Sequence, residues 1–257
     1  MANVARPGIS ACVITLNEAD RIEACLASLA FCDEIVVVDS GSTDATVEIA
    51  RARGARVLTR AFDGYRRQKD FAVRAASCDW VLCVDADERV TATLRNSIEQ
   101  AQATGFPAAG FRFARATEYF GAFLRHGNAY PDRVMRLFDR RRGGFRGDRE
   151  IHEHASVDGD VRTLSGDLEH RAYRSLSDQL ARLDRYARMM AEHLHQRGRR
   201  AHVYTIVLNP FWRFLRGYIL RAGFLDGWRG LVYAYVEADY VRQKSIKLWL
   251  LDRGEKI

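Results

Sequence analysis

The sequence predicts an α/β fold with a mostly parallel sheet, followed by a helical extension at the C-terminal end. In the first hundred residues, short apolar runs rich in β-branched residues alternate with amphipathic segments of helical spacing. Connections of that kind give parallel strands with helices on both faces of the sheet. From residue 176 onward the apolar residues follow helical spacing. We therefore expect a sheet domain over residues 1–175 and a helical extension over residues 176–257.

Each expected element of the first half follows from its local pattern. The strands are short apolar runs bounded by turn-forming or charged residues: 9–15, 34–39, 56–59 and 80–85. The helices between them have apolar residues every three or four positions: 18–30, a helix that ends at Arg53, 65–76 and 91–103. Ser42 or Thr43 is expected to cap the helix that ends at Arg53.

The second half is irregular at first and then helical. Residues 111–116 and 133–138 are expected to be strands, and the Arg/Gly-rich residues 140–149 a loop. Three amphipathic helices are expected after them: 176–196, 210–222 and 228–251.

The composition argues against an integral membrane protein, a secreted protein and a zinc-ribbon protein. The 257 residues are 47% apolar and 28% charged, as in a globular protein, with a formal net charge of +7. No apolar run approaches the about 18 residues of a spanning helix, and the N-terminus lacks the layout of a signal peptide. Five cysteines without Cys-x-x-Cys spacing are expected to be buried thiols. The positive charge is compatible with nucleic acid, an anionic membrane or a phosphorylated substrate.

Three of the expected strands end in polar residues, at 15–18, 39–44 and 85–88. In open α/β sheets, ligands bind beyond the carboxyl ends of the strands. No Gly-x-Gly-x-x-Gly motif follows the first strand, so a dinucleotide site is not indicated. The polar strand ends therefore predict a site for a nucleotide and a metal ion.

Two acidic positions in this set have alternative interpretations. Asp85 and Asp87, two residues apart, can converge on one hard cation, which would neutralise a diphosphate leaving group. The alternative is a solvated acidic turn that caps the next helix. Asp39 can accept hydrogen bonds from a base or a ribose. The alternative for Asp39 is turn and cap chemistry together with Asp44.

These stretches resemble the motifs of inverting family-2 glycosyltransferases. They are, in this order, VITLNE at 13–18, VVVDSGSTD at 36–44 and DWVLCVDADE at 79–88. The resemblance covers residues 8–175 and implies the GT-A fold, in which a Rossmann-like sheet with flanking helices binds the nucleotide. Two further stretches resemble more narrowly the lipopolysaccharide core β-1,4-glucosyltransferases: QKDFA at 68–72, and IHE at 151–153 together with His170.

The resemblance implies roles for the residues of the donor site. By similarity, Thr15, Asn17, Glu18 and Asp39 would line the uridine pocket, and Asp85 would lie near the ribose. Ser42 and Lys69 complete the set of residues that we expect to bind the nucleotide sugar. Asp87 would be the main ligand of a divalent ion, Mg²⁺ or Mn²⁺, with Asp85 close to the same ion. Lys69 would reach a donor phosphate, unless it belongs to a solvated helix face.

An inverting transfer also needs a carboxylate that takes the proton from the acceptor hydroxyl. Glu153 is the candidate for this base, because the family places a His-Glu pair near this distance after the metal motif. Asp148 and Glu150 compete for the role, and the Glu-Asp dipeptide that many family members use is absent. The nearby histidines either contact the diphosphate or metal or are structural: His152, His154 and His170.

The resemblance implies transfer of a hexose, with glucose favoured, from a UDP-sugar to a lipid-linked lipopolysaccharide inner-core acceptor. The alternative within the family is a polyprenyl phosphate or another cell-surface glycan as acceptor. A phosphatase with Asp85 as nucleophile and Asp87 as acid would leave the turn at 39–44 without a role. Nucleic-acid binding is not expected, since no recognised motif accompanies the positive charge.

The positive charge is concentrated in the second half. Residues 1–110 hold 12 Lys+Arg and 15 Asp+Glu, whereas residues 111–257 hold 28 and 18. Residues 196–225 contain six arginines and no acidic residue, interleaved with aromatic and aliphatic side chains. Such a segment predicts a helix that lies on an anionic membrane, and we expect a cytoplasmic protein bound peripherally to the inner face of the cell membrane. The alternative is a helix packed on the sheet domain with an Arg-rich solvent face.

Overall fold

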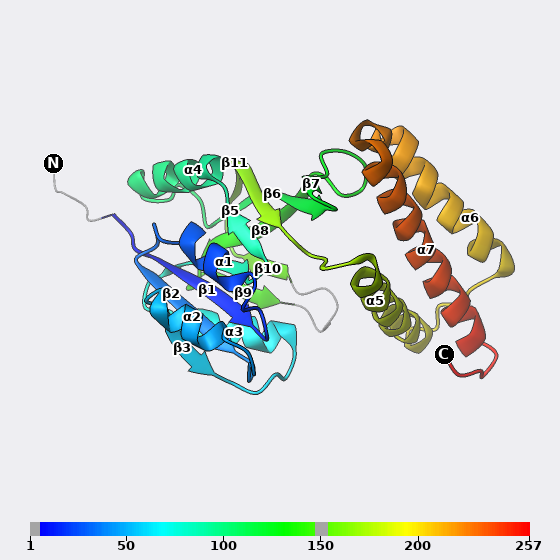
Figure 1. Ribbon diagram of the computed structural model, residues 1–257, viewed down its shortest axis with the longest axis horizontal. Coiled ribbons are helices and arrows are strands. Elements are labelled where there is room, and N and C mark those ends of the chain that lie inside the picture. The colour runs from blue at the N-terminus through cyan, green and yellow to red at the C-terminus, as the bar shows by residue number, and fades with distance from the viewer. Residues whose placement is uncertain (1–5, 147–153) are drawn as a thin grey trace. The chain divides into compact units, whose positions relative to one another are not determined.

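The computed structural model describes residues 6–146 and 154–257, and this part of the chain forms two compact units (Figure 1). The sheet unit comprises the residues up to Arg115 together with Arg133–His170. The helical unit comprises Ala116–Asp132 and Arg171–Ile257. The segment 116–132 therefore belongs with the C-terminal helices, although it lies inside the range expected for the sheet domain. The domain boundary at residue 175 remains a prediction.

A mixed sheet is the centre of the sheet unit. Its parallel half has the spatial order β3, β2, β1, β4, with the bounds Arg56–Thr59, Glu34–Asp39, Ile9–Thr15 and Trp80–Asp85. β8 (Asp132–Asp139) is antiparallel to β4. The sheet continues through β6, β11 and β5, with the bounds Gly110–Tyr119, Val161–His170 and Glu88–Val90. With β7 (Ala122–Phe123), which pairs with the end of β6, the described residues contribute nine strands.

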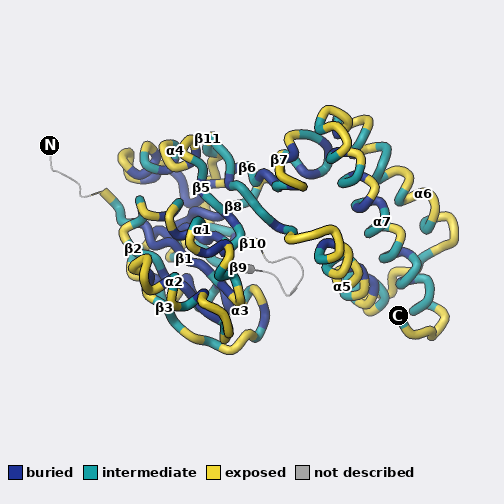
Figure 2. Tube along the Cα trace, viewed as in Figure 1, coloured by how far each residue is buried: buried dark blue, intermediate teal, exposed yellow. Residues whose placement is uncertain are grey.

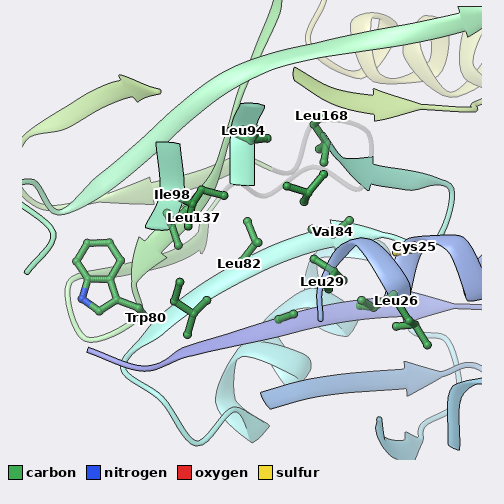
Figure 3. Close-up of a cluster of buried hydrophobic side chains, with 14 of the residues drawn as sticks. Cys25, Leu26, Leu29, Trp80, Leu82, Val84, Leu94, Ile98, Leu137 and Leu168 are labelled. Carbon is green, nitrogen blue, oxygen red and sulfur yellow. The ribbon is translucent and has the colours of Figure 1, made fainter. Parts of the chain in front are cut away.

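Side chains alternate across the strands and form a separate core on each face of the sheet. On one face, Leu82 and Val84 of β4 pack with α1 (Ile22–Ser28), α2 (Thr46–Ala52) and α4 (Ala92–Ala103), as Figure 3 shows for α1 and α4. On the other face, Val81 and Cys83 pack with α3 and with a two-stranded ribbon of β9 and β10. Their bounds are Tyr65–Ala75, Gly143–Arg146 and His154–Val157. Strands covered on both faces read as continuous apolar runs, which is why β1, β2 and β4 could be predicted.

Glu34, at the start of β2, joins neighbouring strands by hydrogen bonds. Its carboxylate accepts from Ser10 Oγ at 2.6 Å, from the N–H of Ser77 at 2.7 Å and from Arg56 Nη2 at 2.8 Å. Burial alone would raise the pKa of Glu34, but these hydrogen bonds outweigh burial and lower the pKa to about 2. The ionised form of Glu34 therefore stabilises this edge of the sheet.

We expect Glu34→Gln to reduce the acid sensitivity of folding. The pKa of Glu34 in the folded state lies below the unfolded value of about 4.3, so its stabilisation is complete above that pH. This stabilisation is lost as the pH falls toward the folded-state pKa of about 2. Urea titrations across this pH range should show a shallower fall in the free energy of unfolding for the variant. Glu48→Gln, on an exposed position of α2, should keep the wild-type slope; a Glu34→Gln slope as steep as that of the wild type would contradict the prediction.

The helical unit contains three long helices, α5 (Leu176–Gln196), α6 (Val203–Phe214) and α7 (Gly227–Leu251). A π-helical turn (Leu215–Leu220) and a 3₁₀ turn (Gly223–Asp226) connect α6 to α7. α7 packs against both α5 and α6. None of the described helices is both long and apolar enough to cross a bilayer.

The segment 116–132 contributes to the core of the helical unit. Tyr119, Leu124 and Ala129 are buried and pack with Tyr173, Val232 and Tyr233. The hydroxyl of Tyr119 donates a hydrogen bond to Gln179 Oε1 of α5 at 2.8 Å. These contacts explain why the segment belongs to the helical unit.

The structure corrects several predicted boundaries. Residues 143–146 are β9 and not loop, since Phe145 is buried with its ring 6.1 Å from that of Phe138. The helix expected at 18–30 begins only at Ile22, after a turn. The helix expected at 210–222 begins at Val203, where Thr205 Oγ1 accepts from the N–H of His202 at 3.3 Å. Pro210 therefore lies inside α6 and does not start it.

Two expectations for individual side chains also change. Ser42 and Thr43 do not cap α2, because the helix begins at Thr46 and both residues bond elsewhere. All five cysteines are free thiols, and three of them are buried as expected: Cys12, Cys25 and Cys83. The other two, Cys32 and Cys78, are only partly buried.

Candidate active site

The carboxyl ends of β1, β2 and β4 meet at one edge of the sheet. In the register of the strands, Thr15 of β1 lies opposite Asp39 of β2, and Ile14 lies opposite Asp85 of β4. Asp39 and Asp85 therefore flank the end of β1, where a parallel sheet is expected to bind ligands. The candidate site consists of these three strand ends and the loops that follow them.

Asp39 organises the turn after β2. It is almost fully buried, and its Oδ2 accepts from the N–H groups of Gly41 and Ser42, both at 2.9 Å. Its Oδ1 accepts from the hydroxyl of Ser42. Gly41 has a φ of 97°, which glycine adopts without strain. This is the turn chemistry given above as the alternative for Asp39, and of the about four lone-pair sites of a carboxylate, one remains for a ligand.

Asn17 connects the loop after β1 to the same turn. Its N–H donates to Ser42 Oγ at 2.9 Å, and its Oδ1 accepts from the N–H of Thr43 at 2.8 Å. Its φ of 54° lies in the left-handed region, in which Asn is enriched among the residues other than glycine. The N–H of Glu18 donates to Thr46 Oγ1 at 2.9 Å. Three of the residues expected at the site, Asn17, Asp39 and Ser42, are thus held in one hydrogen-bonded unit, and Glu18 ties the same loop to the start of α2.

Asp85 is the centre of a buried ionic network. Lys69 Nζ of α3 lies 3.0 Å from Asp85 Oδ1, and Arg136 Nη2 of β8 donates to Asp85 Oδ2 at 2.8 Å. Glu88, which is fully buried, accepts from Arg136 at 3.0 Å and from Arg115 at 3.3 Å. Burial alone would raise the pKa of Asp85, but Arg136 and Lys69 outweigh it and hold the pKa well below its ordinary value. Asp85 is therefore ionised whenever the protein is folded near neutral pH.

Lys69 is part of this network and does not face solvent. Its side chain is buried and its Nζ lies 5.7 Å from the centre of the Phe145 ring. The alternative of a solvated helix face is therefore wrong, because this side of α3 packs onto the sheet. Contact of Lys69 with a donor phosphate remains a prediction.

Asp87 lies in a second cluster with Arg21 and His170. His170 Nε2 is 3.5 Å and Arg21 Nη1 is 3.7 Å from Asp87 Oδ2. Burial alone would raise the pKa of Asp87, but His170 and Arg21 outweigh it and lower the pKa. Within the described residues, Arg21 Nη1 and His170 Nδ1 are buried without a hydrogen-bond partner. Buried polar atoms of this kind need an explanation, and a ligand that completes their bonding supplies one.

The residues at Asp87 fit a divalent ion that takes part of its ligands from the substrate. The described residues contain no group of three His, Cys, Asp or Glu side chains that could hold a metal. Asp87 and His170 offer two ligand atoms 3.5 Å apart, close to the about 3 Å between neighbouring ligands of an octahedral ion. Mg²⁺ commonly completes such a set with water and phosphate oxygens. The carboxylate of Asp85, expected as a second ligand, is engaged by Lys69 and Arg136.

The predicted base lies outside the described residues. Glu153 and its competitors Asp148 and Glu150 fall in the range 147–153, as does His152. His154, at the first position of β10, is exposed.

The sequence interpretation missed the arginines of the site. Arg136 had a signal, since it is a charged residue in the apolar run of the strand expected at 133–138. Arg115 had the same signal in the strand expected at 111–116. Arg21 had none, because its ion pair with Asp87 joins segments far apart in sequence.

An α/β sheet with ionised carboxylates and buried arginines at the carboxyl ends of parallel strands has the architecture of a nucleotide-binding enzyme. Residues 10–160 match the family described as glycosyl transferase family 2, and the chain belongs to this family. The protein is therefore a glycosyltransferase, which leaves no support for the phosphatase interpretation.

Related proteins match nearly the whole chain. A lipopolysaccharide core biosynthesis glycosyltransferase, LpsC of Rhizobium meliloti (strain 1021), is 30% identical over 249 residues, which cover 92% of each protein. An uncharacterized glycosyltransferase of Rickettsia bellii (strain RML369-C) is 30% identical over 255 residues, covering 93% of this chain and 85% of that protein. The mannosyltransferase PcManGT of Pyrobaculum calidifontis, solved in complex with GDP-Man and Mn²⁺, has a TM-score of 0.54 at 18% identity. The matched region covers 97% of this chain and 89% of PcManGT. This likeness confirms the predicted GT-A fold.

Proposed function

We propose that the protein transfers a hexose, preferably glucose, from a UDP-sugar to a lipopolysaccharide inner-core acceptor, with inversion and with the help of Mg²⁺ or Mn²⁺. The observation that carries the donor part is the cluster of Asp87, Arg21 and His170 at the edge where a parallel sheet is expected to bind ligands. In this cluster Arg21 Nη1 and His170 Nδ1 are buried without a hydrogen-bond partner among the described residues. The acceptor class rests on the similarity to LpsC, which is a lipopolysaccharide core biosynthesis glycosyltransferase.

We place the uridine at the ends of β1 and β2. Thr15 Oγ1 is buried there without a hydrogen-bond partner among the described residues, and Thr15 is in register with Asp39. A base edge or ribose hydroxyl would bond to Thr15 and to the remaining lone-pair site of Asp39. Asn17, Glu18 and Ser42 shape this pocket by holding the two loops together.

The diphosphate belongs next to Asp87 in this proposal. Asp87 and His170 would hold the ion, and Arg21 would donate from Nη1 to a phosphate oxygen. When bound, the ion would neutralise the negative charge that develops on the diphosphate as it leaves. Asp85, fixed in its ionised form by Lys69 and Arg136, would accept from a ribose hydroxyl beside the ion.

Glu153 remains our proposed base. The residue that follows it, His154, pairs with Arg146 in the β9–β10 ribbon. Phe145 of the same ribbon lies against Lys69, a partner of Asp85. The described part of the ribbon therefore lies near Lys69, which supports the proposal that the adjoining residues supply the acceptor base.

A lipid-linked acceptor would require the enzyme to work at a membrane. We propose that it acts in the cytoplasm as a peripheral protein on the inner face of the cell membrane. A polyprenyl phosphate is the alternative acceptor at the same place.

A panel of nucleotide sugars tests the donor and the acceptor. The protein is incubated with UDP-glucose, UDP-galactose or GDP-mannose, in Mg²⁺, in Mn²⁺ or with a chelator, and release of the nucleoside diphosphate is measured. We expect slow, metal-dependent release of UDP from UDP-glucose, accelerated by truncated lipopolysaccharide core. Release of nucleotide from GDP-mannose only would contradict the proposed UDP-sugar donor. Release that the chelator leaves unchanged would contradict the proposed metal dependence. If a polyprenyl phosphate accelerates the release of UDP and core oligosaccharide does not, the acceptor is a polyprenyl phosphate and not lipopolysaccharide.

A further inference from the structure

Helix α6 exposes a continuous apolar face. Figure 2 shows α6 as exposed or intermediate along its whole length, and none of its residues is buried. The exposed side chains form two rows with a spacing of four residues, which places them on one side of the helix. They are Val203, Tyr204, Val207, Leu208, Phe211 and Trp212, each between 54% and 64% exposed. Isolated exposed apolar residues are ordinary on protein surfaces, but a contiguous face of this kind marks a site of interaction.

Exposed arginines lie at both ends of this apolar face. Arg197 and Arg199 precede α6, and Arg216 and Arg221 follow it. The two other arginines of the region are engaged within the helical unit, Arg213 with Glu237 and Arg200 with Asp252. Arg213 therefore does not belong to the charged rim. Residues 196–225 contain no Asp or Glu, so no acidic residue of this segment offsets the rim.

We propose that the apolar face of α6 lies in the headgroup region of an anionic bilayer, parallel to the membrane plane. The chain is helical from Val203 through the π-helical turn to Leu220, and none of the described helices is long and apolar enough to cross a bilayer. An amphipathic helix with Trp and Phe on one side and arginines beside them binds at the interface instead. The arginines would contact the phosphates of anionic lipids while Phe211 and Trp212 enter the acyl boundary.

A second copy of the chain fits this face less well than a lipid surface does. In a two-fold symmetric contact of α6 with α6, the arginines at one end of each helix would meet those at the other end of its partner. Like charges brought together in that way oppose the contact, whereas anionic headgroups neutralise them. The inference rests on the proposed lipid-linked acceptor, which gives the enzyme a reason to work at a membrane.

Flotation with lipid vesicles tests the surface. The protein is mixed with phosphatidylcholine vesicles, with or without phosphatidylglycerol, at low and at high salt. We expect binding to the anionic vesicles at low salt, and a loss of at least about tenfold in Phe211→Ser/Trp212→Ser, which removes the largest inserted side chains. Arg216→Gln/Arg221→Gln should weaken binding to the anionic vesicles to a similar degree, about tenfold, and abolish the preference for them.

The control pair is Val161→Ser/Arg162→Gln, which changes an exposed apolar residue and an exposed arginine of β11 in the sheet unit. It should bind vesicles as the wild type does. Metal-dependent release of UDP from a soluble donor is measured on the same samples and should be equal in all variants, so that loss of vesicle binding is separated from failure of the donor site. Equal flotation of the wild type and the α6 variants would overturn the proposal. A second outcome would also overturn the proposal: the wild type binds no vesicles and is a dimer, and Phe211→Ser/Trp212→Ser converts it to a monomer. The apolar face of α6 would then be a protein interface.

Discussion

Replacing Arg136 by methionine is expected to lower the free energy of unfolding by about 3–5 kcal/mol, the usual cost of leaving buried charges without their partner. Arg136 donates to Asp85 at 2.8 Å and to the fully buried Glu88 at 3.0 Å. Methionine replaces the aliphatic part of the arginine side chain but carries no charge. Of the ion pairs described above, Glu88 would then keep only the one with Arg115, and Asp85 only the one with Lys69. Urea unfolding at neutral pH measures the effect.

Arg133→Met provides the matched control on the same strand. Arg133 is exposed and its replacement should change the free energy of unfolding by less than about 0.5 kcal/mol. Arg136→Lys should recover part of the loss, because it restores a charge but not the two directed hydrogen bonds. A loss for Arg136→Met no larger than that of the control would mean that Arg136 does not compensate Asp85 and Glu88.

Replacing Asp87 by asparagine is expected to reduce metal-dependent UDP release by about 100-fold or more, the scale of losing one charged group at a site of developing charge. The amide keeps the volume of the carboxylate but is a far weaker ligand for a hard cation. Release of UDP from UDP-glucose is measured at increasing Mn²⁺, and bound Mn²⁺ is followed by its electron paramagnetic resonance. We expect both the rate and the affinity for Mn²⁺ to fall.

Asp160→Asn is the control, since Asp160 is an exposed carboxylate in the same unit. It should keep the rate and the metal affinity of the wild type. Urea unfolding of both variants guards against a general loss of structure. If Asp87→Asn binds Mn²⁺ as the wild type does and releases UDP at the normal rate, Asp87 is not a ligand of the metal ion.

Three of the parallel strands, β1, β2 and β4, could be predicted to the residue because both of their faces are covered, whereas the edge strand β3 is only partly buried. β1, β2 and β4 are covered by α1, α2 and α4 on one side and by α3 with the ribbon on the other, so almost every position is apolar. β11 could not be predicted in the same way. Its sequence is mostly polar, with Gly166 at a φ of 96°, and its pairing with β6 and β5 makes it a strand.

The acidic residues of the site and Lys69 could be predicted, whereas the arginines could not. Asp39 and Asp85 are the last residues of their strands and Asp87 lies two residues further on, so their place at the sheet edge follows from the order of elements alone. The cations reach the site by long-range folding. Arg136 comes from β8, which lies beside β4 although 51 residues separate Arg136 from Asp85. The local pattern marks Arg136 as a charged residue in an apolar strand, but it does not show which carboxylates Arg136 binds.

The helical unit is not a tail that can be removed at its first helix. The chain enters this unit twice, once at residues 116–132 and again from Arg171 to the end. A protein shortened after His170 would keep Tyr119, Leu124 and Ala129 but lose Tyr173, Val232 and Tyr233, against which they pack. Evolutionary or engineered exchange of the C-terminal helices therefore has to include the 116–132 insertion, and the two segments form one exchangeable module although they are far apart in the sequence.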